Sequence, residues 1–206
     1  NFVSKYVPGI TIETYQKTYN TPVNCCSLND YLACAQAAIA LMQTHEQLYD
    51  ATKDVIAQLE KEQVLYAELR FAPLQHLSNG LSPNQVIESC LKAIEDYHGP
   101  VKVNLILCTL RHFTKEQSDL TADLVVQYYN KGVVGFDLAA DEAGFNLENH
   151  RNAFQRLHDL GILCTSHAGE ARGAESVRET IKELKVNRIG HGIRSTEDTE
   201  LLEDLK

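Results

Sequence analysis

The stretch Gly161–Glu170, with the sequence Gly-Ile-Leu-Cys-Thr-Ser-His-Ala-Gly-Glu, decides how the fold is interpreted. Its first half, Ile162–Thr165, is a short apolar and β-branched run, which is typical of a buried strand. Residues 174–184 follow with apolar residues at the spacing of a helix that buries one face. His167 and Glu170 are therefore expected where a strand ends and turns towards a helix. In a protein of repeated β/α units, that edge of the sheet carries the chemistry.

Outward from this stretch, strand and helix patterns alternate along most of the chain. Residues 1–27 are predicted to be an irregular loop with one helical turn. Strands are predicted over residues 64–72, 101–110, 133–139, 162–165 and 188–192. Helices are predicted over residues 28–40, 46–61, 83–98, 115–130 and 147–160, over 174–184, and again from Ser195 and Asp198 onward. Thr44 with Gln47, Ser82 with Gln85 and Thr114 with Gln117 have the spacing of capping boxes, and Asn146 is the expected cap of its helix.

Five strand–helix units predict parallel strands joined by right-handed crossovers. Such units form either an open doubly wound sheet or part of a (β/α)₈ TIM barrel. No Gly-x-Gly-x-x-Gly motif follows the first strand, which disfavours the dinucleotide-binding form of the open sheet. Because polar residues recur at the ends of several strands, we favour an α/β fold that is an incomplete (β/α)₈ barrel, with residues 1–206 as a single partial domain.

Composition narrows the class of protein. The 206 residues suffice for one core, and the formal net charge of −9 argues against a nucleic-acid partner. No apolar run is long enough for a membrane span, and the first residues do not resemble a signal peptide. The six cysteines contain no C-x-x-C pair and are interpreted as free or buried thiols. We therefore expect a cytoplasmic protein without a membrane partner.

Most polar residues near the strand ends also have a structural interpretation. Glu68 and Arg70 are interpreted as an interior charge pair that fixes strand geometry. Arg111 and His112 are interpreted as structural residues, and Asp141 and Glu142 are explained equally well as capping residues of a loop. Five further histidines are expected at the surface: His45, His76, His98, His150 and His158.

His167 alone is as compatible with a core histidine as with a metal ligand, but Glu170 and His191 at successive strand ends favour a functional site. A neutral imidazole binds divalent metals well, and zinc lowers the pKa of bound water to about 7. A desolvated glutamate near the same pocket has a raised pKa and can donate a proton. A second histidine can orient the water or stabilise developing charge. This trio suits hydrolytic attack on an sp² carbon, with the glutamate protonating a neighbouring nitrogen.

Five segments resemble motifs of the adenosine deaminase family of metal-dependent amidohydrolases, in order, over most of the chain from about Leu28 to Lys206. They are Tyr66–Pro73 (YAELRFAP), Ile106–His112 (ILCTLRH), Asp137–Glu142 (DLAADE), Ser166–Glu170 (SHAGE) and Arg188–Gly192 (RIGHG). The resemblance implies a (β/α)₈ barrel with one zinc ion per complete active site. It also implies small-molecule substrates: adenosine and deoxyadenosine become inosine and deoxyinosine, with release of ammonia, by attack of zinc hydroxide on C6.

Residue by residue, the resemblance implies that His167 is a zinc ligand and that Glu170 protonates the purine at N1. His191 would orient the hydroxide and stabilise the transition state. Members of the family hold the purine with the backbone amide of a glycine in the third-strand motif, and that position is Ala140 here. Gly169 is the second expected substrate-binding residue.

Parts of the family pattern are absent. The family takes two zinc ligands from a His-x-His motif on its first strand, and none of the eight histidines here are two residues apart. The aspartate ligand of the last strand, within a Ser-x-Asn-Thr-Asp-Asp type of motif, is also missing. In family terms the chain therefore holds strands two to six. We expect that these residues alone neither bind zinc tightly nor turn over substrate.

Two alternatives remain open. The first is a deaminase of another 6-aminopurine, such as adenine or aminofutalosine, although adenine deaminases tend to have Asp-His-Gly where this chain has Gly190-His191-Gly192. The second is a non-catalytic remnant that acts as a binding or structural protein. The zinc deaminases of cytidine and nucleic acids are excluded, because they need His-x-Glu with Pro-Cys-x-x-Cys. The sequence predicts no oligomeric state.

Overall fold

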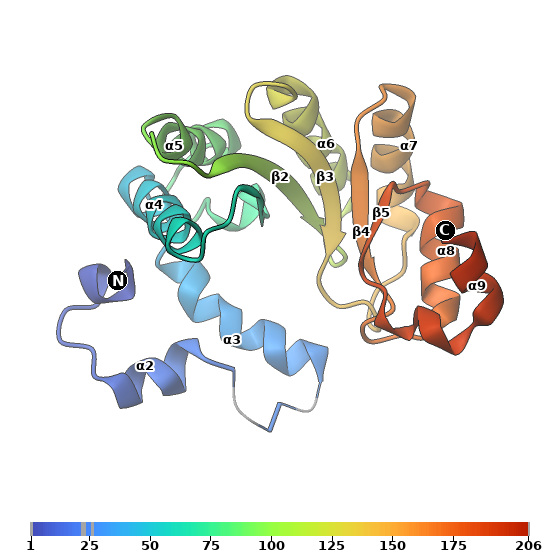
Figure 1. Ribbon diagram of the computed structural model, residues 1–206, viewed down its shortest axis with the longest axis horizontal. Helices are drawn as coiled ribbons and strands as arrows, with labels where there is room; N and C mark the ends of the chain where they lie inside the picture. The colour runs from blue at the N-terminus through green and yellow to red at the C-terminus, as the bar shows by residue number, and fades with distance from the viewer. Residues whose placement is uncertain (1, 22–23, 26, 206) are drawn as a thin grey trace. The chain divides into compact units, whose positions relative to one another are not determined.

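A computed structural model describes residues 2–21, 24–25 and 27–205 (Figure 1). The chain divides into two compact units. The first comprises Asn1–Leu69 with Pro73–Leu105, and the second comprises Arg70–Ala72 with Ile106–Lys206. The single domain over residues 1–206 stays a prediction. None of the helices within the described ranges is long and apolar enough to cross a membrane.

The first unit is mainly helical: α1 (Phe2–Tyr6), α2 (Ile12–Tyr19), α3 (Leu28–Ala40), α4 (His45–Lys61) and α5 (Pro83–Glu95). The predicted irregular loop over residues 1–27 is wrong where α1 and α2 form; positions 1, 22, 23 and 26 lie outside the described residues. Thr11 caps α2 by accepting a hydrogen bond from the Thr14 amide. The ammonium group of Lys5 on α1 pairs with Glu46 and Asp50 on α4, a contact across more than forty residues that no local pattern indicates.

The helix starts were predicted well where the cap is local. Ser82 with Gln85 forms a full capping box on α5, and Thr114 with Gln117 forms one on α6 (Lys115–Tyr128). At α4 only half of the box forms, because the side chain of Gln47 accepts from the amide of Gln43 instead of that of Thr44.

Two predicted caps act differently. Asn146 accepts from Glu148 at a 3₁₀ turn, Glu148–His150, that precedes α7 (Arg151–Asp159). The last helix, α9 (Thr199–Asp204), is capped by Asp198, whereas Ser195 lies buried in the 3₁₀ segment Ile193–Glu197.

The sheet contains β1 (Tyr66–Phe71), β2 (Lys102–Leu110), β3 (Val133–Ala139), β4 (Cys164–Ala168) and β5 (Arg188–His191). Its strand order follows the sequence, β1-β2-β3-β4-β5, and β4 pairs in parallel with both β3 and β5. A doubly wound sheet reverses its strand order at a switch point, and this sheet does not. Sequential order is what part of a barrel requires.

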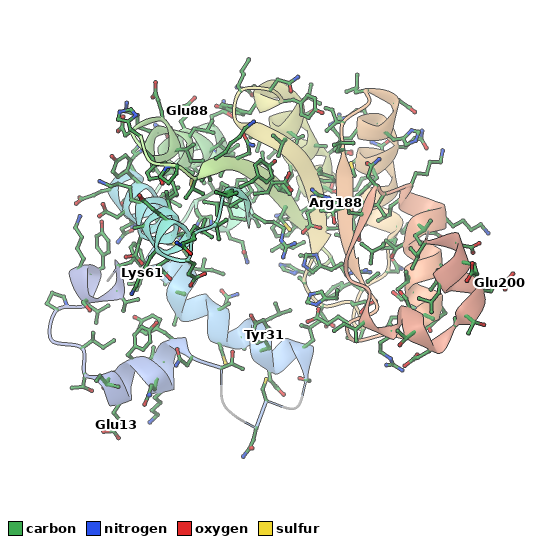
Figure 2. The ribbon with its side chains drawn as sticks, viewed as in Figure 1. Glu13, Tyr31, Lys61, Glu88, Arg188 and Glu200 are labelled. Atoms are coloured by element: carbon green, nitrogen blue, oxygen red, sulfur yellow. The ribbon has the colours of Figure 1, made fainter. Side chains whose placement is uncertain are left out.

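In the second unit the helices cover these strands in turn. α6 packs against β3, and α7 and α8 (Ala174–Leu184) pack against β4 (Figure 1). The rings of Phe136 on β3 and Phe154 on α7 are both fully buried, with centroids 4.9 Å apart. Every residue of β4 is buried. Figure 2 shows Glu200 of α9 and Arg188 of β5 among the charged residues drawn in this unit, and both are exposed.

Two of the histidines expected at the surface are buried. His76 donates from Nδ1 to the Met42 carbonyl at 2.8 Å. His150 contacts Ser118 Oγ through Nδ1 at 3.1 Å and donates from Nε2 to the Arg111 carbonyl at 3.2 Å. Burial lowers the pKa of both rings. Burial of each imidazole is tolerated because a polar partner far along the chain hydrogen-bonds to it. The sequence pattern does not show such a partner. The five described cysteines are free thiols, as predicted.

Candidate active site

His167 lies within β4, one residue before the strand ends, and its ring packs over Gly190 of β5. The register pairs His167 with Gly190 and Ala168 with His191. A Cβ atom at position 190 would lie 3.3–3.4 Å from three atoms of the His167 ring. Such contacts are tighter than ordinary packing allows, so the missing side chain of Gly190 leaves room for the imidazole.

The hydrogen bonds of His167 determine its tautomer. Nδ1 lies 3.1 Å from the Leu138 carbonyl and 3.2 Å from Asp137 Oδ2. Both partners are acceptors, so Nδ1 carries a proton and donates, which leaves Nε2 as the ring nitrogen that can bind a metal. A histidine that is fixed through one nitrogen in this way is typical of a metal ligand that binds through the other.

Asp137 on β3 is the buried acceptor that organises the groups behind His167. Its Oδ2 also lies 3.3 Å from Nε of Arg70 and accepts from the thiol of Cys108 at 3.4 Å. Burial, and then the charge of Asp137, raises the pKa of Cys108, so this thiol stays protonated and donates. The carboxylate of Glu68 accepts from the Tyr66 hydroxyl at 2.7 Å. The guanidinium of Arg70 on β1 therefore pairs with Asp137 on β3. The Glu68–Arg70 pair expected from the sequence stays a prediction.

The structure brings His167, Glu170 and His191 together. Nε2 of His191 lies 3.4 Å from Oε2 of Glu170, and the rings of His191 and His167 are 5.1 Å apart. His191 has a φ of 63° and Gly192 follows with a φ of 61°. Two successive left-handed residues turn the chain sharply at the end of β5. The side chains of His191 and Glu170 are both about one-third exposed, so solvent reaches the pair.

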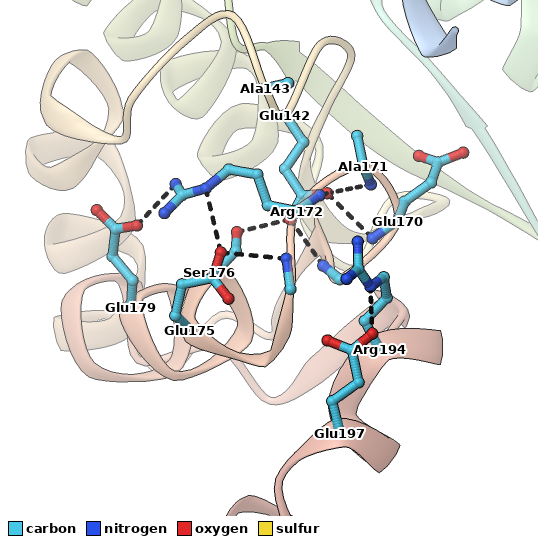
Figure 3. Close-up of polar contacts among 12 residues, drawn as sticks. Glu142, Ala143, Glu170, Ala171, Arg172, Glu175, Ser176, Glu179, Arg194 and Glu197 are labelled. Atoms are coloured by element: carbon cyan, nitrogen blue, oxygen red, sulfur yellow. Dashed lines mark hydrogen bonds and ion pairs between the residues drawn. The ribbon is translucent and has the colours of Figure 1, made fainter. Parts of the chain in front are cut away.

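The role of Glu142 differs from that of a loop cap, as which the sequence pattern explained it equally well. Only Asp141 acts in this way, by accepting from the amides of Ala143 and Gly144. Glu142 is buried, with 1% of the residue's surface exposed, and its carboxylate lies among backbone amides. It accepts hydrogen bonds from four consecutive amides and one hydroxyl (Figure 3). The donors are Gly169 (2.7 Å), Glu170 (3.0 Å), Ala171 (2.7 Å), Arg172 (3.0 Å) and Ser176 Oγ (2.6 Å).

These donors lower the pKa of Glu142, led by Ser176 and the Arg172 amide, against the opposing effect of burial. A carboxyl group whose pKa is lower in the folded state stabilises the protein above its unfolded pKa, near 4.5. That contribution is lost as the pH falls through the folded pKa. We therefore expect the difference in unfolding free energy between wild type and Glu142→Gln to be largest near pH 6 and to shrink below pH ~4.5. Urea denaturation at several pH values measures it, and a difference independent of pH would contradict the prediction.

Ala140 and Gly169, the expected substrate-binding residues, both have left-handed backbone conformations. Gly169 has a φ of 71°, and a Cβ atom there would lie 2.7 Å from Val177 Cγ2. Ala140 has a φ of 78°, which an L side chain rarely adopts. The conformation at position 140 thus favours the glycine that the family pattern has there.

We expect Ala140→Gly to raise the unfolding free energy by about 0.5–1 kcal/mol, because relief of backbone strain exceeds the extra freedom of glycine in the unfolded chain. Ala143 is a matched control, since its φ is not positive. Ala143→Gly is expected to destabilise by about 0.5 kcal/mol. Equal losses in both variants, measured by urea denaturation, would show that Ala140 is unstrained.

Arg111, directly after β2, is 2% exposed and contacts the backbone of His167. Its Nη2 donates to the His167 carbonyl at 2.8 Å, and its Nη1 donates to the Phe145 carbonyl at 3.4 Å. The structural interpretation of Arg111 is therefore confirmed, and its contact is with the backbone of the candidate ligand itself.

The donor set fits a metal ion only in part. His167 offers a free Nε2, but a protein zinc site needs at least three protein ligands. Within the described residues, no group of three or more His, Cys, Asp or Glu side chains is arranged to hold a metal ion. These residues therefore provide one prepared ligand and not a complete site.

Comparison with known proteins assigns the family. The family model described as "Adenosine deaminase" matches residues 3–206. The chain belongs to the adenosine deaminase family. An adenosine deaminase of Clostridium acetobutylicum is 38% identical over 201 residues, covering 96% of this chain and 59% of the relative. One of Mycobacterium ulcerans is 35% identical over 190 residues, covering 89% and 52%. The chain thus spans little more than half the length of these relatives.

The likeness to solved structures confirms the incomplete (β/α)₈ barrel. An adenine deaminase from Arthrobacter aurescens is similar with a TM-score of 0.84 and 25% identity, over 99% of this chain and 62% of that protein. An amidohydrolase from Burkholderia ambifaria, solved with bound Zn, has a TM-score of 0.80 at 18% identity, over 96% of this chain and 55% of that protein. This second likeness concerns the fold alone.

Proposed function

We propose that a polypeptide carrying these residues deaminates adenosine and deoxyadenosine to inosine and deoxyinosine, with release of ammonia, in the cytoplasm. The observation that carries the proposal is the convergence of His167, Glu170 and His191, with Glu170 and His191 3.4 Å apart. Curated relatives at 33–38% identity named adenosine deaminase support the choice of substrate.

In this proposal each residue has one task. His167 would hold one zinc ion through Nε2, together with ligands from outside this chain. When bound, zinc makes a water nucleophile available at neutral pH. Glu170 protonates the purine at N1, which makes C6 more electrophilic, and His191 orients the attacking water and stabilises developing charge. The backbone amide of Ala140 holds the purine, and Gly169, whose own amide donates to Glu142, is the second substrate-binding residue.

We also propose that the 206 residues alone are inactive, because they supply one of the zinc ligands. The test compares the isolated chain with a polypeptide that adds the missing ligands, using the absorbance change from adenosine to inosine. Deamination by the longer polypeptide alone is expected. Tight zinc binding and turnover by the isolated chain would refute this part of the proposal.

The same chemistry would act on another 6-aminopurine, and the likeness to an adenine deaminase at 25% identity favours testing this second candidate. We expect kcat/KM for adenosine to exceed that for adenine by at least about 100-fold, because a pocket that hydrogen-bonds ribose penalises a ligand lacking it. AMP, which keeps the ribose, is compared as a third substrate. Competition between the three substrates measures the ratio. Faster turnover of adenine or AMP would reassign the substrate.

A further inference from the structure

The turn after β4 is held by charged side chains from two other segments. Glu142 accepts the amides of Gly169, Glu170, Ala171 and Arg172, as described above. Two residues before Gly169, the carbonyl of His167 accepts a hydrogen bond from Arg111 at 2.8 Å. Successive amides that converge on one anion form a nest, a geometry that binds carboxylates and phosphates. Here the anion is the side-chain carboxylate of Glu142.

The carbonyl groups of the same turn are held as well. The amide of Gly192 donates to the Ala168 carbonyl at 2.9 Å, and that of Arg194 donates to the Gly169 carbonyl at 3.2 Å. These bonds attach the turn to the segment directly after His191. The backbone that bears Glu170 is therefore fixed on one side to Glu142 and on the other to the end of β5.

We propose that Glu142 is a positioning residue that fixes the turn 169–172 and so aims the carboxylate of Glu170 at His191. One of its four amide partners is the amide of Glu170 itself, at 3.0 Å. The side chain of Glu170 points away from the Glu142 carboxylate (Figure 3) and reaches His191 Nε2 at 3.4 Å. Glu142 thus acts through Glu170. The catalytic meaning of this role rests on the proposed function, whereas the positioning is independent of it.

Two neighbouring carboxylates help to define what is particular to Glu142. Glu179 contacts the same turn, but only through the side chain of Arg172, at 3.0 Å. Glu175 accepts from the amide of Gly173 at 3.1 Å, outside the four-amide nest. Glu179 is therefore a matched control: it has the same charge and lies beside the same loop, without contact to its amides.

The experiment uses the 206-residue chain with Glu142→Ala, in the presence and absence of acetate. Alanine keeps Cβ, and acetate matches the methylene and carboxylate that are removed. Without acetate, hydrogen exchange at the amides of 169–172 is expected to rise on the order of 100-fold, because each amide loses a charge-assisted bond. The nuclear Overhauser contact between Glu170 Hγ and the His191 ring is expected to disappear. Acetate should restore both, and Glu179→Ala should change neither.

Restoration by acetate distinguishes a positioning role from a general effect on stability. In a chain that is only destabilised, acetate has no ordered set of amides at 169–172 to bind, so it would restore neither signal. If Glu142→Ala keeps the Glu170–His191 contact, or if acetate restores exchange protection without it, the proposal is overturned. Should Glu142→Ala fail to fold, Glu142→Gln serves instead, with faster exchange and a weakened contact expected. No turnover is needed, so a failure of the longer polypeptide to deaminate adenosine would disprove the proposed function and leave this result readable.

Discussion

Glu170→Gln is expected to lower kcat for adenosine about 10²–10⁴-fold in a polypeptide that carries this chain and the missing zinc ligands, with KM changed little. Glutamine matches glutamate in size but has no carboxyl proton to give. Protonation of the purine is needed only as the transition state forms, so the loss falls on kcat and not on substrate binding. Steady-state kinetics over a range of adenosine concentrations measures both constants.

The control for this prediction is Glu175→Gln, at the start of α8, whose side chain is 65% exposed. It removes a carboxylate five residues further along, one that the proposed chemistry does not use, and kcat is expected to stay within about twofold. A loss in Glu170→Gln no larger than in Glu175→Gln would remove Glu170 from the reaction. An increase in KM with kcat unchanged would instead make it a binding residue.

The sequence was informative wherever the determining interaction is local. Alternating strands and helices, two of the capping boxes and helix α8 depend on residues within a few positions of one another, and the structure has them as predicted. The sequential strand order follows from the same repetition. The histidine–glutamate–histidine convergence was predictable because parallel strands bring their carboxyl ends to one edge.

What the sequence could not show depends on partners far along the chain or on backbone dihedrals. Glu142 meets its amides 27 to 30 residues away, and nothing in the run Asp137–Glu142 distinguishes it from a cap. The left-handed conformation of Ala140 could not be predicted from the sequence, because glycine and not alanine is the residue that indicates a positive φ. The burial of His150 depends on the Arg111 carbonyl, 39 residues away.

Arg111→Met is expected to lower the unfolding free energy by about 3 kcal/mol, the cost of losing charged hydrogen bonds in a buried site. Methionine keeps an unbranched side chain of similar length, so packing changes little while the charge is lost. The His167 carbonyl then loses its donor at 2.8 Å. Burial lowers the pKa of Arg111 and the charge of Glu142 opposes that shift, which means that the variant also removes a favourable charge near Glu142.

Arg151→Met on α7 is the comparison that decides the origin of this effect. Arg151 pairs with Glu183 at 2.8 Å, but its side chain is 52% exposed. An exposed ion pair contributes about 0.5 kcal/mol, so its loss is expected to be small and to fade with added salt. Urea denaturation of both variants measures the difference. If Arg111→Met costs no more than Arg151→Met, then the backbone of His167 is held by the strands alone, and Arg111 makes no contribution to the turn that follows.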